Sequence, residues 1–337
     1  MQVSMIAIDL AKTIFQLCGV NQAGKPQFNK SIRRNKLLSF LKYYPDAVIA
    51  MEACSGSNYW GRMLEQLGYK VLLIPPIHVK PFVKGNKNDR NDAFAITEAA
   101  SRPNMRFVKP RTLEQTDLMM LHKIRARRVE SRKALTNQLR GMLNEYGPVL
   151  GRGASTLRKS LPGLLEDADN GLTESARVLI RDIQNEWQHL DEDIERLDRK
   201  IKQQAKSNAH TRRLMTITGV AEQTATAMYA FAGDGKGYKN GRHFAANIGL
   251  VPKEHSSGGV QKLGGITKRG NRYLRRLLVQ GAWSVLRNIK GKTDRLSRWA
   301  QALVERRGKH KAVVAIANKM ARIIWSMLFH RTEYQPR

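Results

Sequence analysis

Cysteine is almost absent from this chain, since only Cys18 and Cys54 occur in 337 residues. Two cysteines are too few for a disulfide framework or a cysteine zinc site, and the histidines show no metal-ligand spacing. These absences exclude a disulfide-rich secreted domain and a zinc finger. We expect a reducing, intracellular setting.

Long apolar runs are also missing. No stretch approaches the roughly 18 uninterrupted apolar residues of a membrane span. The N-terminus opens on an alternating run rather than on a charged region followed by an apolar one. We therefore expect a soluble, cytoplasmic protein without a membrane partner.

Acidic residues are scarce. The chain has 28 Asp and Glu against 59 Lys and Arg, which gives a net charge of +31 and a pI near 10.5. The excess is uneven, because residues 201–337 carry +21 whereas residues 151–200 carry −3. A charge this large exceeds what solubility requires and indicates a polyanionic partner, held mostly by the C-terminal part.

The first eighty residues indicate an α/β domain. Hydrophobic residues make up 42% of the chain, which is enough for packed cores and excludes wholesale disorder. Short apolar runs alternate with helical patterns in the order β-β-β-α-β-α-β. The predicted strands cover residues 3–9, 13–20, 27–32, 47–51 and 71–74. This order matches a ribonuclease-H-like mixed sheet with the strand order 3-2-1-4-5.

Two long helices are predicted in the middle of the chain. A capping-box pattern opens a basic helix over residues 112–146, and residues 174–206 form a second helix. Apolar residues of the second helix recur at steps of three and four from Leu179 to Ile201, in the acidic segment. This seam fits either an intramolecular hairpin with the first helix or a dimerising coiled coil.

The C-terminal part, residues 208–337, is expected to be mainly helical. Residues 214–225 are typical of a helix, a glycine-containing turn and a new helix, a pattern that resembles a helix-hairpin-helix. Residues 249–276 are the densest mixture of small, hydroxylic and cationic side chains. Helices at 273–289 and 311–329 supply apolar faces against which this segment can pack.

Four carboxylates occupy positions that suit a metal site: Asp9, Glu52, Asp89 and Asp92. In the expected strand order Asp9 and Glu52 end neighbouring strands, and the spacing of three places Asp89 and Asp92 on one helix face. Each acid alone is more often a helix cap or a loop residue. Four together, in a chain poor in acid, favour a site for Mg²⁺. Two ions about 3.5–4 Å apart would clamp the attacking and leaving oxygens of a phosphoryl transfer.

A series of short motifs, in a fixed order along the chain, carries a resemblance to a known family. The motifs are Ala7-Ile-Asp9-Leu-Ala-Lys12, Met51-Glu52-Ala-Cys-Ser-Gly56, Asn88-Asp89-Arg-Asn-Asp92-Ala93, Thr218-Gly219-Val220, Pro252-Lys-Glu-His-Ser-Ser257-Gly258 and Ile266-Thr-Lys268-Arg-Gly270-Asn-Arg-Tyr-Leu-Arg275-Arg276. Together they resemble the insertion-sequence transposases with an Asp-Glu-Asp-Asp domain, the serine-type recombinases guided by a bridge RNA. The resemblance implies a RuvC-like catalytic domain over residues 1–108, a coiled-coil segment over 109–207 and a transposase domain over 208–337.

The resemblance also implies roles for single residues. The metal ligands would be Asp9, Glu52, Asp89 and Asp92, and the metal would be Mg²⁺, with two ions. Ser257 would attack a DNA phosphate and become transiently linked to it. Ser256 adjoins this serine, and His255 stands where the family often has an aromatic residue, so either side chain could assist it.

Cations of the basic helix over residues 112–146 and of the segment 262–276 are expected to hold nucleic acid, which would associate the protein with the nucleoid. They are Lys123, Arg127, Arg128, Lys268, Arg269, Arg272, Arg275 and Arg276. The expected partners are donor and target DNA and a structured noncoding guide RNA. Strand exchange needs several active sites, so we also expect a homo-oligomer, a tetramer built as two dimers.

Two other hypotheses stay open at this stage. One is a RuvC-like, metal-dependent junction resolvase or nuclease, which hydrolyses DNA with water and does not use Ser257. The other is a non-catalytic nucleic-acid scaffold, in which the four acids are only caps and loop residues.

Overall fold

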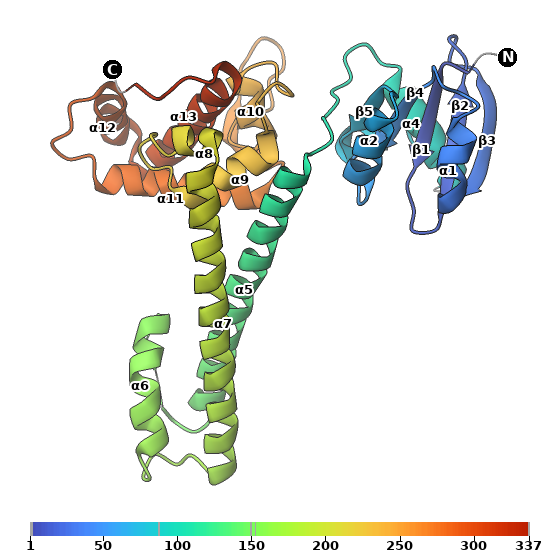
Figure 1. The fold of residues 1–337 in the computed structure, drawn as a ribbon. Helices are drawn as coiled ribbons and strands as arrows, with labels where there is room; N and C mark the ends of the chain where they lie inside the picture. Colours follow the sequence, from blue (N-terminus) through green and yellow to red (C-terminus); the bar gives the residue numbers. More distant parts are fainter. Residues whose placement is uncertain (1–2, 87, 149, 152, 336–337) are drawn as a thin grey trace. The chain divides into compact units, whose positions relative to one another are not determined.

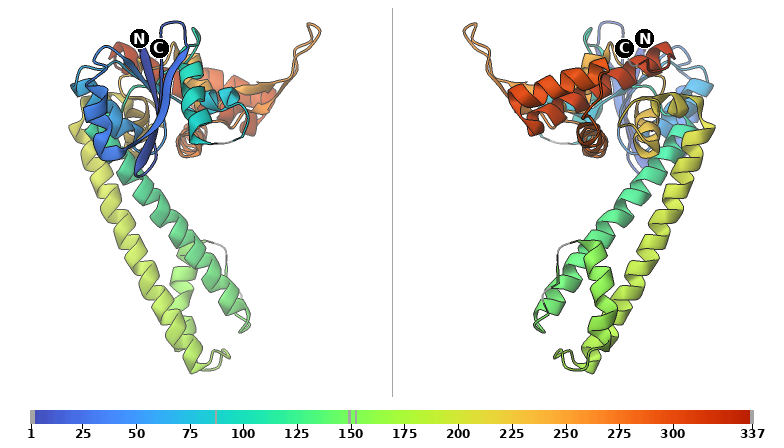
Figure 2. Two further views of the ribbon diagram at one scale, coloured as in Figure 1. Left: turned by 90° about the vertical axis from the view of Figure 1, so that its right-hand side faces the viewer. Right: turned by 90° about the vertical axis from the view of Figure 1, so that its left-hand side faces the viewer.

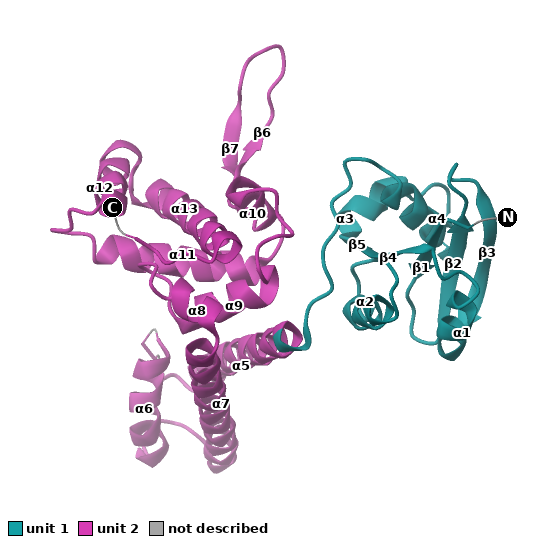
Figure 3. Ribbon diagram, turned by 45° about the horizontal axis from the view of Figure 1, so that its top comes forward, with its two compact units in different colours: residues 1–114 teal, residues 115–337 magenta. Residues whose placement is uncertain are grey.

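The computed structural model describes residues 3–86, 88–148, 150–151 and 153–335. The chain divides into two compact units, residues 1–114 and residues 115–337 (Figure 3). Each unit is described by itself below. The first unit is an α/β domain and the second is built mainly from helices.

The first unit is built on a five-stranded mixed sheet (Figure 1). Its strands are β1 (Met5–Asp9), β2 (Ile14–Val20), β3 (Pro26–Arg33), β4 (Val48–Glu52) and β5 (Val71–Ile74). They lie in the order β3-β2-β1-β4-β5, which confirms the strand order expected from the sequence. β2 runs antiparallel to both β1 and β3, whereas β4 runs parallel to β1 and β5 parallel to β4.

Both faces of this sheet are covered, because its central strands are apolar on both sides. The helices of the unit are α1 (Leu37–Leu41), α2 (Ser57–Gln66), α3 (Pro76–Val79) and α4 (Asp89–Ala100). Ile6 and Ile8 of β1 belong to the cluster with α1 and α2 on one face. Ala7, between them, belongs to the cluster with α4 on the other face. This period of two places α4, and the acids at its start, on the face opposite α1 and α2.

A long helical hairpin opens the second unit. It consists of α5 (Leu113–Asn144) and α7 (Glu174–Ser207), joined through α6 (Ala154–Glu166). Figures 1 and 2 show α5 and α7 running side by side, with α6 lying against them at the far end. Leucines of all three helices pack around Trp187 there. The two long helices agree with the prediction within two residues at each end, but α6 was not predicted.

Ion pairs join α5 to α7, so the hairpin within one chain is the arrangement observed. Arg128 lies 3.0 Å from Asp193, and Arg132 lies 2.6 Å from Asp191. The acidic segment therefore neutralises part of the basic helix. The apolar seam of α7 is buried from Trp187 to Ile201 and Ile183 is partly buried, whereas Leu179 is 62% exposed.

The rest of the second unit is a helical bundle. It contains α8 (Ala209–Leu214), α9 (Glu222–Ala232), α10 (Gly241–Asn247), α11 (Arg272–Arg287), α12 (Arg295–Arg307) and α13 (Lys309–His330), with a small hairpin of β6 (Pro252–Glu254) and β7 (Leu263–Ile266). α13 is long and apolar enough to cross a membrane, but it contributes to the largest hydrophobic core and half of its most apolar stretch is buried. It therefore packs as a core helix of the second unit.

The turn between α8 and α9 packs closely on α11. Gly219 has a φ of +86°, and a Cβ at this position would lie 2.7 Å from the carbonyl oxygen of Gly281. Only glycine fits both the backbone angle and the space. Packing against α11 thus accounts for the glycine that resembled a helix-hairpin-helix signature.

Candidate functional site

Asp9 and Glu52 lie at the ends of neighbouring parallel strands. Ile8 of β1 pairs with Met51 of β4, so the two acids are the next residues of both strands. The carboxyl ends of parallel strands meet at one edge of a sheet, which is where open α/β sheets bind ligands. The sheet register therefore brings these two carboxylates to the same edge.

Asp89 and Asp92 lie in the first turn of α4. The side chain of Asn88 caps this helix by accepting a hydrogen bond of 2.9 Å from a backbone N–H of the turn. Asn29 of β3 donates to the carbonyl of Arg90 at 3.0 Å and ties the turn to the sheet. Neither aspartate is the N-cap, so capping does not account for them.

The four acids act electrostatically on one another. Burial raises the pKa of Asp9 to about 6, and the negative charges of Asp92, Asp89 and Glu52 contribute to the rise in that order. A backbone hydrogen bond from Leu10 opposes it. The structure thus brings the acids of two strands and one helix within electrostatic range of Asp9.

The donor set suits a hard divalent cation. In residues 3–335, apart from the few that are not described, no three His, Cys, Asp or Glu side chains are close enough to hold one metal ion. The carboxylates therefore repel one another without sharing a coordination sphere. Carboxylate oxygens are the ligands that Mg²⁺ prefers, and a bound cation would relieve the repulsion.

Ser257 lies at the tip of the β6–β7 hairpin. It faces Val260 across a two-residue turn closed by a hydrogen bond of 3.0 Å from the Val260 N–H to the Ser257 carbonyl. Gly258 and Gly259, the central residues, have φ values of +56° and +76°, as a type I′ turn requires. The sequence Ser-Gly-Gly-Val thus places Ser257 beside the apex of an exposed hairpin.

The neighbouring serine is engaged elsewhere. The Ser256 hydroxyl donates to Glu254 at 2.7 Å and accepts from the backbone N–H of Lys262 at 3.3 Å. These contacts hold the Ser256 side chain against the hairpin. His255 is exposed, and its backbone N–H donates across the hairpin to the Lys262 carbonyl at 3.0 Å.

The predicted nucleic-acid cations divide into two groups. Five are exposed and form no ion pair with the described carboxylates: Lys123, Arg127, Lys268, Arg269 and Arg272. Three are engaged within the unit: Arg128, Arg275 and Arg276. Arg128 pairs with Asp193, and Arg276 pairs with Glu130 at 3.1 Å.

Arg275 braces the base of the β6–β7 hairpin. Its guanidinium donates to the carbonyls of Ile248 at 2.9 Å and Arg269 at 3.1 Å. The segments before β6 and after β7 meet so closely that a Cβ at Gly270 would lie 1.8 Å from the Asn247 carbonyl oxygen. The hairpin that carries Ser257 is thus anchored on a tight backbone crossing.

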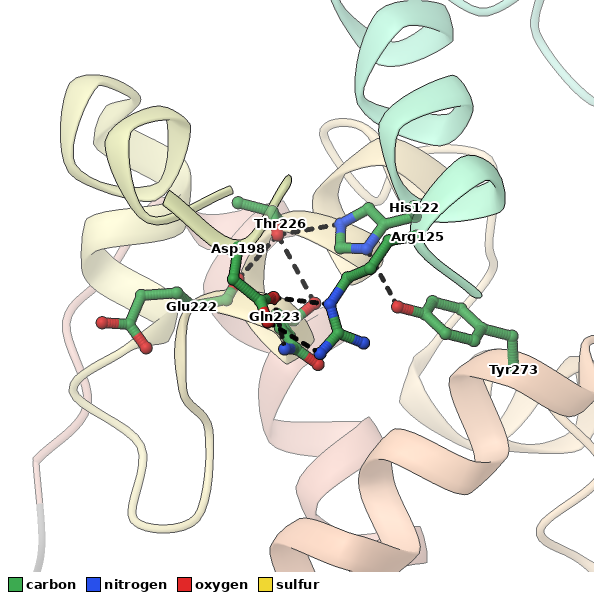
Figure 4. Close-up of polar contacts among 7 residues, drawn as sticks. All are labelled: His122, Arg125, Asp198, Glu222, Gln223, Thr226 and Tyr273. Atoms are coloured by element: carbon green, nitrogen blue, oxygen red, sulfur yellow. Dashed lines mark hydrogen bonds and ion pairs between the residues drawn. The ribbon is translucent and has the colours of Figure 1, made fainter. Parts of the chain in front are cut away.

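A buried polar cluster joins the helical hairpin to the bundle, as Figure 4 shows. His122 of α5 lies 2.9 Å from the hydroxyl of Thr226 on α9 and 3.0 Å from the hydroxyl of Tyr273 on α11. Arg125 and Asp198 form an ion pair beside it. Sequence reasoning missed this cluster, because a histidine in a basic helix carries no pattern that distinguishes a buried one.

Comparison with known proteins identifies the class as transposase. A model named DEDD_Tnp_IS110, described as a transposase, matches residues 6–148, and a model described as the transposase IS116/IS110/IS902 family matches residues 211–298. The first segment contains the four carboxylates, and the second contains Ser257 and the cations that follow it.

Proteins that are similar to the chain over nearly its whole length are also described as transposases. The chain is 44% identical over 333 residues to the transposase for insertion sequence element IS1111A of Coxiella burnetii, covering 99% of this chain and 92% of that one. It is 42% identical over 337 residues to a probable family 20 transposase of Pseudomonas aeruginosa, covering 100% of both. It is 38% identical over 323 residues to the transposase for insertion sequence element IS1328 of Yersinia enterocolitica, covering 96% of each.

The chain belongs to the IS110 family of transposases. This family implies cleavage and rejoining of DNA, and its acidic domain suggests use of a divalent metal.

Proposed function

We propose that this transposase cleaves and rejoins DNA under the guidance of an RNA, with a Mg²⁺-bound acidic quartet and a serine nucleophile. The observation that carries the proposal is the register of β1 and β4, which places Asp9 and Glu52 side by side at one edge of the sheet, while Asp89 and Asp92 of α4 are close enough to raise the pKa of Asp9. The chain has only 28 acids against 59 Lys and Arg, yet three of them repel Asp9, and this repulsion costs stability. A cluster of charges that costs stability is typical of a functional site.

In this proposal the carboxylates hold the metal and orient the phosphate. Asp9 and Glu52 would bind from the sheet edge, and Asp89 and Asp92 from α4. Two Mg²⁺ ions, when bound, would stabilise negative charge on the attacking and leaving oxygens. The anchoring of the first turn of α4 to β3 through Asn29 would keep the acids of the helix in register with those of the sheet.

Ser257 would carry out the covalent step. Its Oγ forms a bond to phosphorus and loses its proton, while the bond from phosphorus to one DNA oxygen breaks and that oxygen takes up a proton. A hydroxyl of a second DNA strand then attacks the phosphoserine, which restores the serine and joins the new strands. The phosphodiester energy is conserved, so no nucleotide cofactor is required. Ser257 suits this role better than Ser256, whose hydroxyl is bound to Glu254.

Nucleic acids would be held by the exposed cations of the second unit. Lys123 and Arg127 lie on the long hairpin, whereas Lys268, Arg269 and Arg272 lie beside the serine hairpin. The net charge of +31 is large enough for two nucleic-acid partners, DNA and a structured guide RNA. A tetramer built as two dimers would supply the active sites that strand exchange needs, and mass photometry of the DNA complex tests that state.

The nucleophile is tested by trapping a covalent adduct on a nicked DNA substrate with Mg²⁺. We expect mass spectrometry to find the DNA attached to Ser257, and we expect the adduct to disappear in Ser257→Ala while Ser256→Ala retains it. An adduct on another residue, or one that persists in Ser257→Ala, would falsify the assignment. Sequencing of RNA that copurifies with the protein tests guidance, since random RNA would argue against it.

The other hypotheses predict different results. A junction resolvase that uses water would lose cleavage in Asp9→Ala but keep it in Ser257→Ala; the family comparisons do not favour it. A scaffold would cleave no DNA and would be insensitive to chelation of Mg²⁺.

A further inference from the structure

A large hollow lies on the second unit beside the hairpin that carries Ser257. Its volume is about 1530 Å³. Pockets for small molecules usually measure about 300–1,000 Å³, so this one suits a longer ligand. Its floor is one face of α13, between His310 and Ser326, and its walls come from the start of α10, from β7 and from Trp299 of α12. We call it the α13 groove.

The α13 groove is the side of α13 that the core leaves uncovered. Residues such as Ile316 and Met320 are fully buried in the main hydrophobic cluster, whereas Lys311, Lys319 and Arg322 line the groove. The lining residues recur at steps of three and four, so they form one stripe along the helix. At 1.5 Å per residue this stripe is about 24 Å long.

The groove is strongly positive. Five cations line it and no acid does: Arg242, Lys268, Lys311, Lys319 and Arg322. None of the five forms an ion pair among the described residues. Burial lowers the pKa of Lys319, and the nearby charges of Arg295 and Arg322 lower it further. Repulsion of this kind is relieved by a bound anion.

The groove is also apolar and aromatic between its cations. Trp299, Trp325 and Ile323 line it together with Val314. The Lys319 ammonium lies 4.4 Å from the centre of the Trp299 ring, and the indole N–H of Trp325 donates to Gly235 at 3.0 Å, so both rings are held in place. A duplex presents mainly phosphates to a protein surface, whereas an unpaired strand also presents bases. Cations beside apolar and aromatic surface therefore suit a single strand.

We propose that the α13 groove binds an unpaired segment of the DNA strand that is joined to Ser257. The link to that strand is the hairpin, because Leu263–Ile266 of β7 line the groove while Ser257 lies at the tip of the same hairpin. The six steps from residue 257 to residue 263 span about 20 Å when extended. Phosphates would contact Lys311, Lys319 and Arg322, with bases against the aromatic walls. The assignment of the strand rests on the proposed function, whereas binding of single strands does not.

Binding of labelled oligonucleotides to the full-length protein tests this. The probes are a 20-nucleotide oligo(dT), a 20-nucleotide oligo(rU) and a 20-base-pair DNA duplex, measured by fluorescence anisotropy over a salt series. The double variant Lys311→Glu/Arg322→Glu alters exposed cations of the groove. The matched control, Arg306→Glu/Arg307→Glu, makes the same charge change at exposed residues of α12 outside it.

We expect the groove variant to weaken oligo(dT) binding at least tenfold more than the control does. The slope of log K against log salt should fall by about 1.4, because each phosphate contact to a single strand contributes about 0.7. Equal losses in both variants, or a greater loss for the duplex than for oligo(dT), would overturn the proposal. A loss confined to oligo(rU) would assign the groove to RNA and overturn the choice of DNA.

A second measurement tests binding in the α13 groove separately from the assignment of Ser257 as the nucleophile. Ser257→Ala should bind oligo(dT) as the wild type does, because it leaves the groove unchanged. Crosslinking with a photoreactive thymine about four nucleotides from the trapped serine should label α13. Absence of that label, with an intact adduct, would refute the path into the groove while leaving Ser257 as the nucleophile.

Discussion

The hydroxyl of Tyr273 lies 3.0 Å from Nδ1 of His122 in the buried cluster of Figure 4. Thr226, on the other side of the ring, donates its own hydroxyl proton to the Glu222 carbonyl at 2.6 Å. Thr226 must therefore accept from Nε2–H of His122, and Nδ1 accepts from the Tyr273 hydroxyl. The Thr226 contact places a proton on Nε2, and burial, which lowers the pKa of His122 to about 4, keeps the ring neutral near pH 7.

Acid should destabilise the second unit through His122. Burial lowers its pKa to about 4, with a further decrease from Arg125 and a small opposing effect of Asp198. The unfolded chain, with an ordinary pKa near 6.5, takes up the proton first, so stability falls between about pH 6.5 and pH 4. We expect a loss of about 3 kcal/mol at this residue, which is 2% exposed. Urea unfolding followed by tryptophan fluorescence measures it.

His122→Gln is the comparison for that experiment. Glutamine cannot titrate, so the free energy of unfolding should change less between pH 7 and pH 4.5 than in the wild type. Other carboxylates titrate in both proteins and cancel in the difference. Parallel pH profiles for the two proteins would contradict the buried, neutral histidine.

Removing a carboxylate should stabilise the first unit while abolishing activity. Asp9→Asn relieves the repulsion from the other three acids, so we expect the metal-free protein to gain about 1–2 kcal/mol, as the partly exposed site is screened by solvent. DNA cleavage should fall at least about 100-fold, since the metal stabilises the transition state.

Mg²⁺ should make the wild type more stable than Asp9→Asn. At 100 times its Kd, a cation that binds only the folded wild type stabilises it by about 2.7 kcal/mol, an effect that Asp9→Asn should lose. Differential scanning fluorimetry with and without Mg²⁺ measures this. Asp46→Asn, an exposed acid of the same unit, serves as control and should show neither effect. A wild type whose melting ignores Mg²⁺ would argue against the metal site.

The backbone conformation of the turn at the tip of the β6–β7 hairpin should affect strand cleavage. Gly258 has a φ of +56°, and a Cβ there would meet no atom within 4 Å. Gly258→Asn should retain most strand cleavage, because asparagine tolerates this conformation, whereas Gly258→Val should lose at least about tenfold. Both variants should melt like the wild type. Equal activity of the two would mean that the turn does not position Ser257.

Two glycines inside helices should respond oppositely to alanine. Gly281 of α11 lies against the α8–α9 turn, where a Cβ would be 2.3 Å from the Gly219 carbonyl oxygen, so Gly281→Ala should cost at least about 3 kcal/mol. Gly141 of α5 has open space, so Gly141→Ala should stabilise by about 0.4–1 kcal/mol. Chemical unfolding of both variants checks the contrast.

The arrangement of the first unit follows from local pattern. Alternating apolar runs predicted the five strands, and the order of strands and helices predicted the neighbours of β1. Because a parallel pair has a fixed register, Asp9 and Glu52 follow directly from the positions of Ile8 and Met51. Such relationships are readable because burial imposes a period on each element.

The contacts of each cation could not be predicted from the sequence in this way. Arg275 and Lys268 stand in the same motif, yet Arg275 donates to two backbone carbonyls while Lys268 lines the α13 groove. Arg128 is paired with Asp193, whereas its neighbour Arg127 is exposed. The sequence does not distinguish paired from unpaired cations, because a positive charge alone does not show which residue lies next to it in the fold.

By itself the sequence determined the sheet and the two long helices, and it predicted the acidic quartet and a polyanionic partner, since each depends on spacing along the chain or on net charge. Only the tertiary structure decided that α5 and α7 pair with each other, that Ser257 lies at the tip of a hairpin, and that one face of α13 is left open. The physical reason is that these features depend on which surfaces meet. Packing between distant segments selects the surfaces that are buried, and those left uncovered remain for ligands.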